Sequence, residues 1–107
     1  MTTAADFAKR ARMVQFTQRP LYQIAHEIHR DWGKAKHRIY FGAVPYLRAM
    51  MELDKITDKY GEDSAKSIVL YFLSNAATWR GEVARRVKAE LKRMVAAENG
   101  RPHTESP

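Results

Sequence analysis

Hydrophobic and polar positions follow a helical period along most of the chain. The clearest case follows Pro20, where apolar residues recur three, four, seven and eleven positions after Leu21 and form one stripe on a helix. Proline suits a first helical turn and glycine a helix end, so we predict a helix from about Pro20 to Gly33. Its apolar stripe comprises Leu21, Ile24, Ala25, Ile28 and Trp32.

Four further segments show helical spacing, and together with the first they predict an all-α fold. Apolar residues recur at intervals of three and four in each, and no segment has the alternation of a convincing strand. Residues 34–42 have no period and are predicted to form a loop, and the stretch before Gly61 is predicted to add a short helical turn. The predicted helices span residues 4–16, 20–33, 43–53, 62–75 and 79–98.

The helix over 62–75 differs from the others because apolar side chains surround it. Residues 68–73 are apolar without a break, and a helix that is apolar on all sides belongs in the middle of a bundle. We place Glu62 and Asp63 in its first turn, where carboxylates stabilise the positive end of the helix dipole.

The last predicted helix is the longest. Thr78 is expected to cap it, and Trp79 is expected to begin its buried stripe. The chain is therefore predicted to be a single-domain bundle of about five helices over residues 1–98, with a long C-terminal helix. A disordered polar tail is predicted over residues 99–107.

Composition supports one folded domain and excludes several classes of protein. The chain has 107 residues, of which 45% are hydrophobic, enough for one core. It has no cysteine, which rules out disulfides and thiolate sites and favours the cytoplasm. The longest apolar run, residues 68–73, is far short of the roughly 20 residues that cross a bilayer, so no membrane association is expected.

The net charge of +7 is concentrated in the first half of the chain. Residues 1–48 carry nine Lys and Arg against three acidic residues, whereas residues 49–107 carry ten against nine. Such an excess favours phosphate backbones or acidic protein surfaces as partners. Solubility alone is an equally good explanation of the same charge.

Catalytic and metal-binding motifs are weak or missing in the sequence. His26 and His29 are three residues apart beside Glu27, whereas the zinc-protease motif places its two histidines four apart. A third histidine, His37, lies in the predicted loop, and surface positions explain all three. The sequence has no nucleophile elbow and no phosphate-cradling glycine loop. We therefore expect no enzyme activity, no cofactor and no metal.

Two basic segments are candidates for nucleic-acid binding. In the predicted loop, basic residues precede Tyr40 and Phe41, as in grooves that hold single strands by phosphate contact and base stacking. The alternative is that these rings anchor the loop in the core. On the last helix, three cations fall on one row, although Glu82 interrupts the field and is positioned to pair with Arg86. The candidates are Lys34, Lys36, Arg38, Tyr40, Arg85, Lys88 and Lys92.

A second group of residues is a candidate for contact with a protein partner. Tyrosine and methionine are favoured at contact sites, although they serve cores as often. The group comprises Tyr22, Tyr46, Met50 and Met51. The long last helix could equally form a homodimer.

Three segments carry a resemblance to a known family. RPLYQIAHEIHRDW, YFGAVPYLRAM and IVLYFLSNAATWRGEVARRVKAELK occur in that order and resemble a family of small uncharacterised proteins of actinobacteriophages and some actinobacterial genomes. The resemblance covers about residues 19–95 and implies a phage-linked, cytoplasmic protein with no assigned activity. Small phage proteins often act on host molecules, so we expect a non-enzymatic binding protein with a host protein as partner, and nucleic acid as the alternative.

Overall fold

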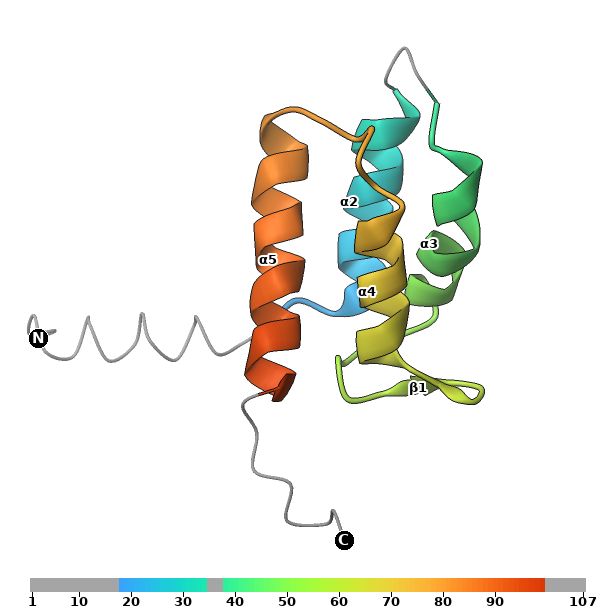
Figure 1. Ribbon diagram of the computed structural model, residues 1–107, viewed down its shortest axis with the longest axis vertical. Helices are drawn as coiled ribbons and strands as arrows, with labels where there is room; N and C mark the ends of the chain where they lie inside the picture. Colours follow the sequence, from blue (N-terminus) through green and yellow to red (C-terminus); the bar gives the residue numbers. More distant parts are fainter. Residues whose placement is uncertain (1–17, 35–37, 100–107) are drawn as a thin grey trace, which may run out of the picture.

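The computed structural model describes residues 18–34 and 38–99 (Figure 1). The predicted helix over 4–16 and the predicted tail from Gly100 onward lie outside the described residues. Lys36 and His37 also lie outside them.

The described residues form four α-helices, one short 3-10 helix and a two-stranded antiparallel hairpin. The all-α prediction is therefore confirmed in outline, but the described part holds four helices where about five were predicted for the chain. No helix in this part is long and apolar enough to span a membrane. The elements are α2 (Leu21–Gly33), η1 (Phe41–Ala43), α3 (Val44–Met50), β1 (Lys59–Tyr60), β2 (Asp63–Ser64), α4 (Ala65–Ser74) and α5 (Glu82–Asn99).

Helix α2 matches its prediction closely. All five residues of the predicted stripe are buried. The first backbone N–H groups of a helix lack partners within it, and here those of Leu21 and Tyr22 each donate at 2.8 Å to the carbonyl groups of Asp54 and Leu53. The turn after α3 thus caps α2 in place of a side chain.

The hairpin was not predicted, and it moves the start of α4. Lys59 pairs with Ser64 and Tyr60 with Asp63, and Gly61 takes the positive φ of 62° that opens the two-residue turn. Asp63 therefore belongs to the hairpin and not to the first turn of α4. The helix begins at Ala65, where the Ser64 hydroxyl accepts a hydrogen bond from the Ser67 N–H at 3.1 Å.

Helix α5 begins at Glu82, three residues later than predicted. The chain turns at residues 77–81, and Gly81 adopts a φ of 112° that side chains rarely allow. Trp79 is buried as predicted but lies in this connection. Its backbone N–H donates a hydrogen bond to the Ala76 carbonyl at 3.0 Å. Arg80 lies in the same connection and not in the helix, and it is exposed. Helical spacing from Trp79 would have placed it on the buried side.

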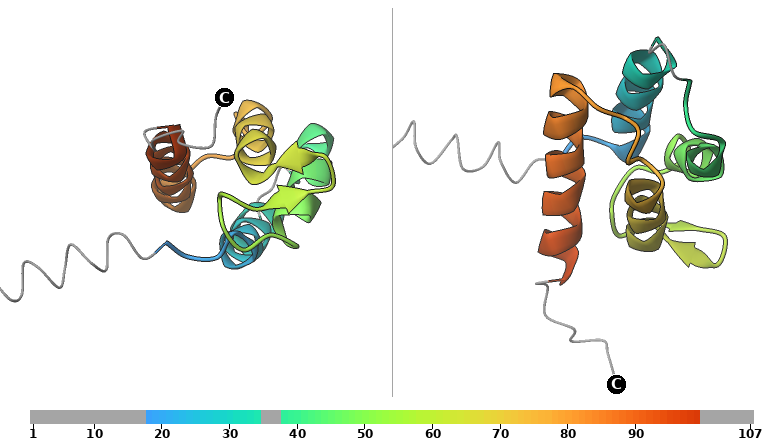
Figure 2. Two further views of the ribbon diagram at one scale, coloured as in Figure 1. Left: turned by 90° about the horizontal axis from the view of Figure 1, so that it is seen from below. Right: turned by 45° about the horizontal axis from the view of Figure 1, so that its top comes forward.

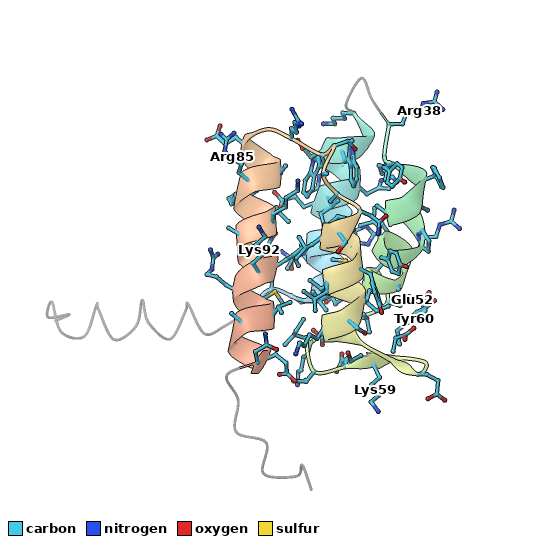
Figure 3. All side chains as sticks on the ribbon, viewed as in Figure 1. Arg38, Glu52, Lys59, Tyr60, Arg85 and Lys92 are labelled. Atoms are coloured by element: carbon cyan, nitrogen blue, oxygen red, sulfur yellow. The ribbon has the colours of Figure 1, made fainter. Side chains whose placement is uncertain are left out.

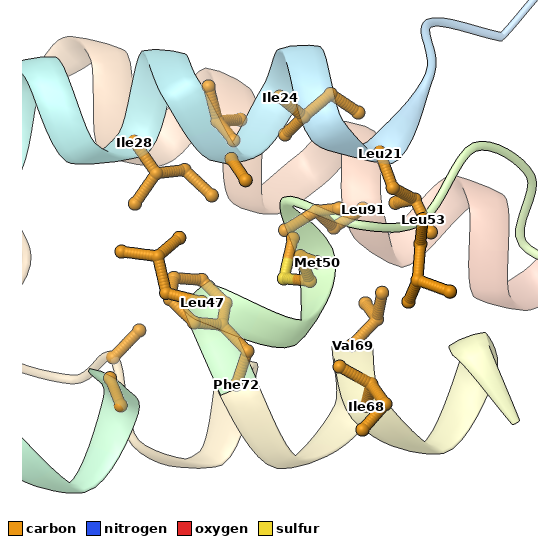
Figure 4. Close-up of a cluster of buried hydrophobic side chains, with 14 of the residues drawn as sticks. Leu21, Ile24, Ile28, Leu47, Met50, Leu53, Ile68, Val69, Phe72 and Leu91 are labelled. Carbon is orange, nitrogen blue, oxygen red and sulfur yellow. The ribbon is translucent and has the colours of Figure 1, made fainter. Parts of the chain in front are cut away.

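The core lies between all four helices. Helices α2, α3 and α4 pack around it, and α5 covers the side of α2 and α4 that faces away from α3 (Figures 1 and 2). Ile28 of α2 points toward Leu47 of α3, and Ile24 of α2 and Leu91 of α5 belong to the same cluster (Figure 4). Burial of this apolar surface is the main source of stability.

One sequence prediction about burial is wrong, and burial removes one candidate contact residue. Helix α4 is not enclosed on all sides, because Leu70 and Tyr71 are exposed. Met50, a candidate contact residue for which a core position was the alternative, is 0% exposed within the core (Figure 4), so the core position holds. Met51 is half-buried against the core.

Candidate functional site

Exposed aromatic rings gather where η1 and α3 meet α4. Phe41 is 79% exposed, Tyr71 52% and Tyr40 43%. The ring centroids of Tyr40 and Phe41 lie 4.9 Å apart, and those of Tyr46 and Tyr71 5.4 Å apart. We call Tyr40, Phe41, Tyr46 and Tyr71 the aromatic surface.

Local backbone geometry holds Tyr40 in place. The Ala43 N–H donates to the Tyr40 carbonyl at 2.9 Å and closes the turn of η1. The Tyr40 ring lies over Gly42, where a Cβ atom would come within 2.5 Å of Tyr40 Cε2 and 2.8 Å of Asn75 Oδ1. Glycine is therefore required at this position for the ring to pack beside the C-terminal end of α4.

A pocket of about 190 Å³ adjoins the aromatic surface. Its walls are Tyr40 and the C-terminal end of α4 with the turn that follows, from Ser74 to Thr78. Asn75 Nδ2 donates to the Tyr71 carbonyl at 2.8 Å, which ties the pocket wall to the aromatic surface. The pocket has the size of a single side chain rather than of a larger ligand.

The predicted partner residues are dispersed. Tyr46 belongs to the aromatic surface, half-buried behind Tyr71. Tyr22 is 44% exposed on α2 and makes no ring contact among the described residues. The core position of Met50 removes it from any surface, and Met51 has only limited access.

The basic loop is exposed where the structure describes it. Lys34 and Arg38 are both exposed at its two ends, and Tyr40 follows on the aromatic surface. The alternative that Tyr40 and Phe41 anchor the loop in the core is not what the structure shows. Lys36 lies outside the described residues.

The three basic residues predicted to form a row on α5 differ in exposure. Arg85 and Lys92 are exposed (Figure 3). Lys88 is half-buried, with Nζ donating to the Trp79 carbonyl at 2.7 Å and lying 5.9 Å from the centre of the Trp79 ring. Burial, together with the positive charges of Lys92 and Arg80, lowers the pKa of Lys88.

The opposite edge of α5 carries an ion-pair network that the sequence did not predict. Arg19 donates to Glu90 through Nε at 3.0 Å and Nη2 at 2.7 Å, and Nη2 also lies 2.9 Å from Glu27. The sequence suggested that Arg86 pairs with Glu82. In the structure Arg86 instead pairs with Glu27 of α2. This network fastens α5 to α2 and to the chain before it.

Nothing in the described part of the chain suggests a metal site. No group of three or more potential ligands gathers there. His26 and His29 are both exposed on α2.

Tyr71 and Arg80 were not among the candidate site residues predicted from the sequence, and Phe41 was named there only beside Tyr40 in the basic loop. Phe41 and Tyr71 stood within apolar runs, and such runs do not reveal which member is exposed. Arg80 followed a buried tryptophan in a segment predicted as helix.

Comparisons of the chain with protein-family models, with curated proteins and with solved structures find no match.

Proposed function

We propose that this chain is a non-enzymatic binding protein that acts on a protein partner, and that the aromatic surface contacts that partner. The observation that carries the proposal is the 79% exposure of Phe41 beside Tyr40 and near the pocket. Contiguous exposed aromatic groups on a soluble domain are typical of interaction sites.

The aromatic surface has the physical properties of a binding hot spot. Tyrosine and phenylalanine bury large areas while fixing only two side-chain torsions, so little conformational entropy is lost on contact. Ring contacts already restrain Tyr40 and Tyr71, and the pocket offers room for one partner side chain. The resemblance to phage proteins makes a host protein the partner class we propose.

Nucleic acid is the second candidate, supported by one specific observation. The exposed rings of Tyr40 and Phe41 follow exposed Arg38 after one intervening residue, which places a cation near them as stacking on bases with phosphate contact requires. We rank it second because Arg38 is the only cation described immediately before these rings, whereas Tyr46 and Tyr71 extend the surface with uncharged groups.

The test is capture from an actinobacterial lysate, with and without nuclease, by tagged wild type and by Phe41→Ser/Tyr71→Ser. Tyr60→Ser, which changes another exposed ring on the hairpin, is the matched control. Urea unfolding of each variant checks that the fold is retained. Tyr22→Ser tests the remaining predicted contact residue separately.

We expect a discrete protein that survives nuclease, that the double variant loses, and that Tyr60→Ser keeps. Capture that disappears with nuclease would replace the protein partner by nucleic acid. Equal capture by wild type and the double variant would exclude the aromatic surface as the contact site.

A further inference from the structure

The charges on α5 are segregated between its two edges. On the edge toward α2, Arg86 is paired with Glu27, and Glu90 with Arg19. The ion pairs among the described residues involve only these four side chains. On the other edge Lys88 and Lys92 lie one helical turn apart, and neither forms an ion pair with another described residue.

A third cation joins these two lysines at the start of α5. Arg80 directly follows Trp79, whose carbonyl accepts the hydrogen bond from Lys88. Lys92 lies one helical turn after Lys88, and Arg80 follows the residue that Lys88 contacts, so the positive charges of both help to lower the pKa of Lys88. Lys92 lies on the face of α5 seen beside α4, well away from the hairpin that carries Lys59 (Figure 3).

The hydrogen bond from Lys88 to the Trp79 carbonyl fixes the position of one of the three cations. It uses one of the three donors of the Lys88 ammonium, which leaves two. The Trp79 ring beneath the side chain is buried and cannot move aside. Lys88 is thus held in position, whereas Arg80 and Lys92 are exposed and free to adjust.

No carboxylate of residues 18–34 or 38–99 forms an ion pair with these three cations, and their mutual repulsion favours an anion between them. A carboxylate supplies one charge and two acceptor oxygens. A phosphate group supplies up to two charges and more acceptor oxygens, and it matches the fork of an arginine as well as the point charge of a lysine.

We propose that Arg80, Lys88 and Lys92 form a binding site for a phosphate group, either free phosphate or a backbone phosphate of a nucleic acid. This site is separate from the aromatic surface and does not depend on it. Its ligand would contact the α4–α5 connection and the first turns of α5.

The test compares wild type with Arg80→Gln/Lys92→Gln. Lys59→Gln/Arg93→Gln is the matched control, because it removes one lysine and one arginine that are exposed elsewhere. Lys88 is left unchanged because its hydrogen bond supports the fold. The probes are inorganic phosphate, a labelled single strand of about 12 nucleotides, and polyglutamate as an anion without phosphate.

We expect the Arg80/Lys92 variant to bind the phosphate probe about tenfold more weakly, and the control less than about twofold more weakly. For the oligonucleotide, the slope of log affinity against log salt should decrease by about 1.4, since single strands contribute about 0.7 per neutralised phosphate. Binding of inorganic phosphate alone would identify free phosphate as the ligand. Tighter binding of the oligonucleotide with this salt dependence would identify the backbone.

Three results would overturn the proposal. Wild type could bind neither phosphate probe at low salt, the control could weaken binding as much as the Arg80/Lys92 variant, or polyglutamate could bind as tightly as the oligonucleotide. None of these results bears on the aromatic surface, whose test uses different variants.

Discussion

The indole rings of Trp32 and Trp79 stack with their centroids 5.7 Å apart and their planes inclined by 15°. Phe72 packs edge-on against both, at centroid distances of 6.1 and 6.4 Å. The Trp79 indole N–H donates at 2.9 Å to Oδ2 of Asp31. Since Trp79 belongs to the α4–α5 connection, this cluster fixes the connection to the end of α2.

Asp31→Ala is therefore expected to destabilise the fold. It leaves the Trp79 N–H without its acceptor in a part-buried site, which costs about 1–2 kcal/mol of the free energy of unfolding. Urea unfolding followed by circular dichroism measures the change. Glu52→Ala, at an exposed position, is the control, and equal midpoints for the two variants would show that the hydrogen bond contributes nothing.

The ion-pair network predicts a loss of stability in acid. Burial by itself would raise the pKa of Glu27, but the hydrogen bonds and charges of Arg86 and Arg19 outweigh it and hold the pKa below its ordinary value. A carboxylate with a lowered pKa stabilises the fold above its unfolded-state pKa, here about 4.5. That stability is lost as the pH falls through the lower folded-state pKa.

Glu27→Gln isolates this contribution. Near pH 7 the variant should be less stable than wild type by about 1 kcal/mol, because these pairs are only partly shielded from water. The difference should shrink as the pH falls from 7 toward 3, because Glu27 of the wild type becomes protonated. Urea unfolding at both pH values tests this, and a difference that stays constant with pH would assign the effect to packing rather than to charge.

The sequence predicted elements well where the apolar spacing was continuous and the ends had clear signals. Helix α2 is such a case, with Pro20 and Gly33 at its ends. The prediction placed Trp79 in the last helix because its spacing to Val83 and Val87 is helical. The positive φ of Gly81 is not helical, so the helix begins only after it. Strands of two residues each are too short to show alternation, so the hairpin gave no periodic signal.

Candidate contact surfaces were harder to predict than helices. The spacing of apolar residues identifies which of them suit a core. Whether a residue is exposed depends on which neighbouring elements cover its face of the helix. Tyr71 looks like a core residue in sequence, and a core position was one of two interpretations of Phe41; both are exposed because no described element covers them. Lys88 looks like a surface cation, but it donates a hydrogen bond to the carbonyl of buried Trp79, nine residues earlier, and so supports the α4–α5 connection.

The burial of Met50 gives a direct test of its corrected position. Met50→Ala should lower the free energy of unfolding by about 2–4 kcal/mol, because it opens a cavity among fully buried side chains. Met51→Ala, at the half-buried neighbour, should cost less than about 1 kcal/mol. Urea unfolding of both variants decides the matter, and similar losses would contradict the core position of Met50.

Gly42 links the backbone to the aromatic surface and provides the last prediction. In Gly42→Ala the new Cβ would lie 2.5 Å from Tyr40 Cε2 and 2.8 Å from Asn75 Oδ1, so at least one of them must move. The Asn75 amide is anchored to the Tyr71 carbonyl, whereas the Tyr40 ring is partly exposed. We therefore expect the Tyr40 ring to swing away and the adjoining pocket to change shape.

The expected result is a separation of binding from folding. Stability should fall by only about 1 kcal/mol, since the displaced ring can turn into solvent, while capture of the partner weakens about tenfold. Chemical shifts of the Tyr40 ring report its movement. Gly33→Ala is the matched control because its Cβ meets nothing within 4 Å, and it should leave capture unchanged. Unaltered capture by Gly42→Ala despite a shifted Tyr40 ring would show that this ring is not part of the contact.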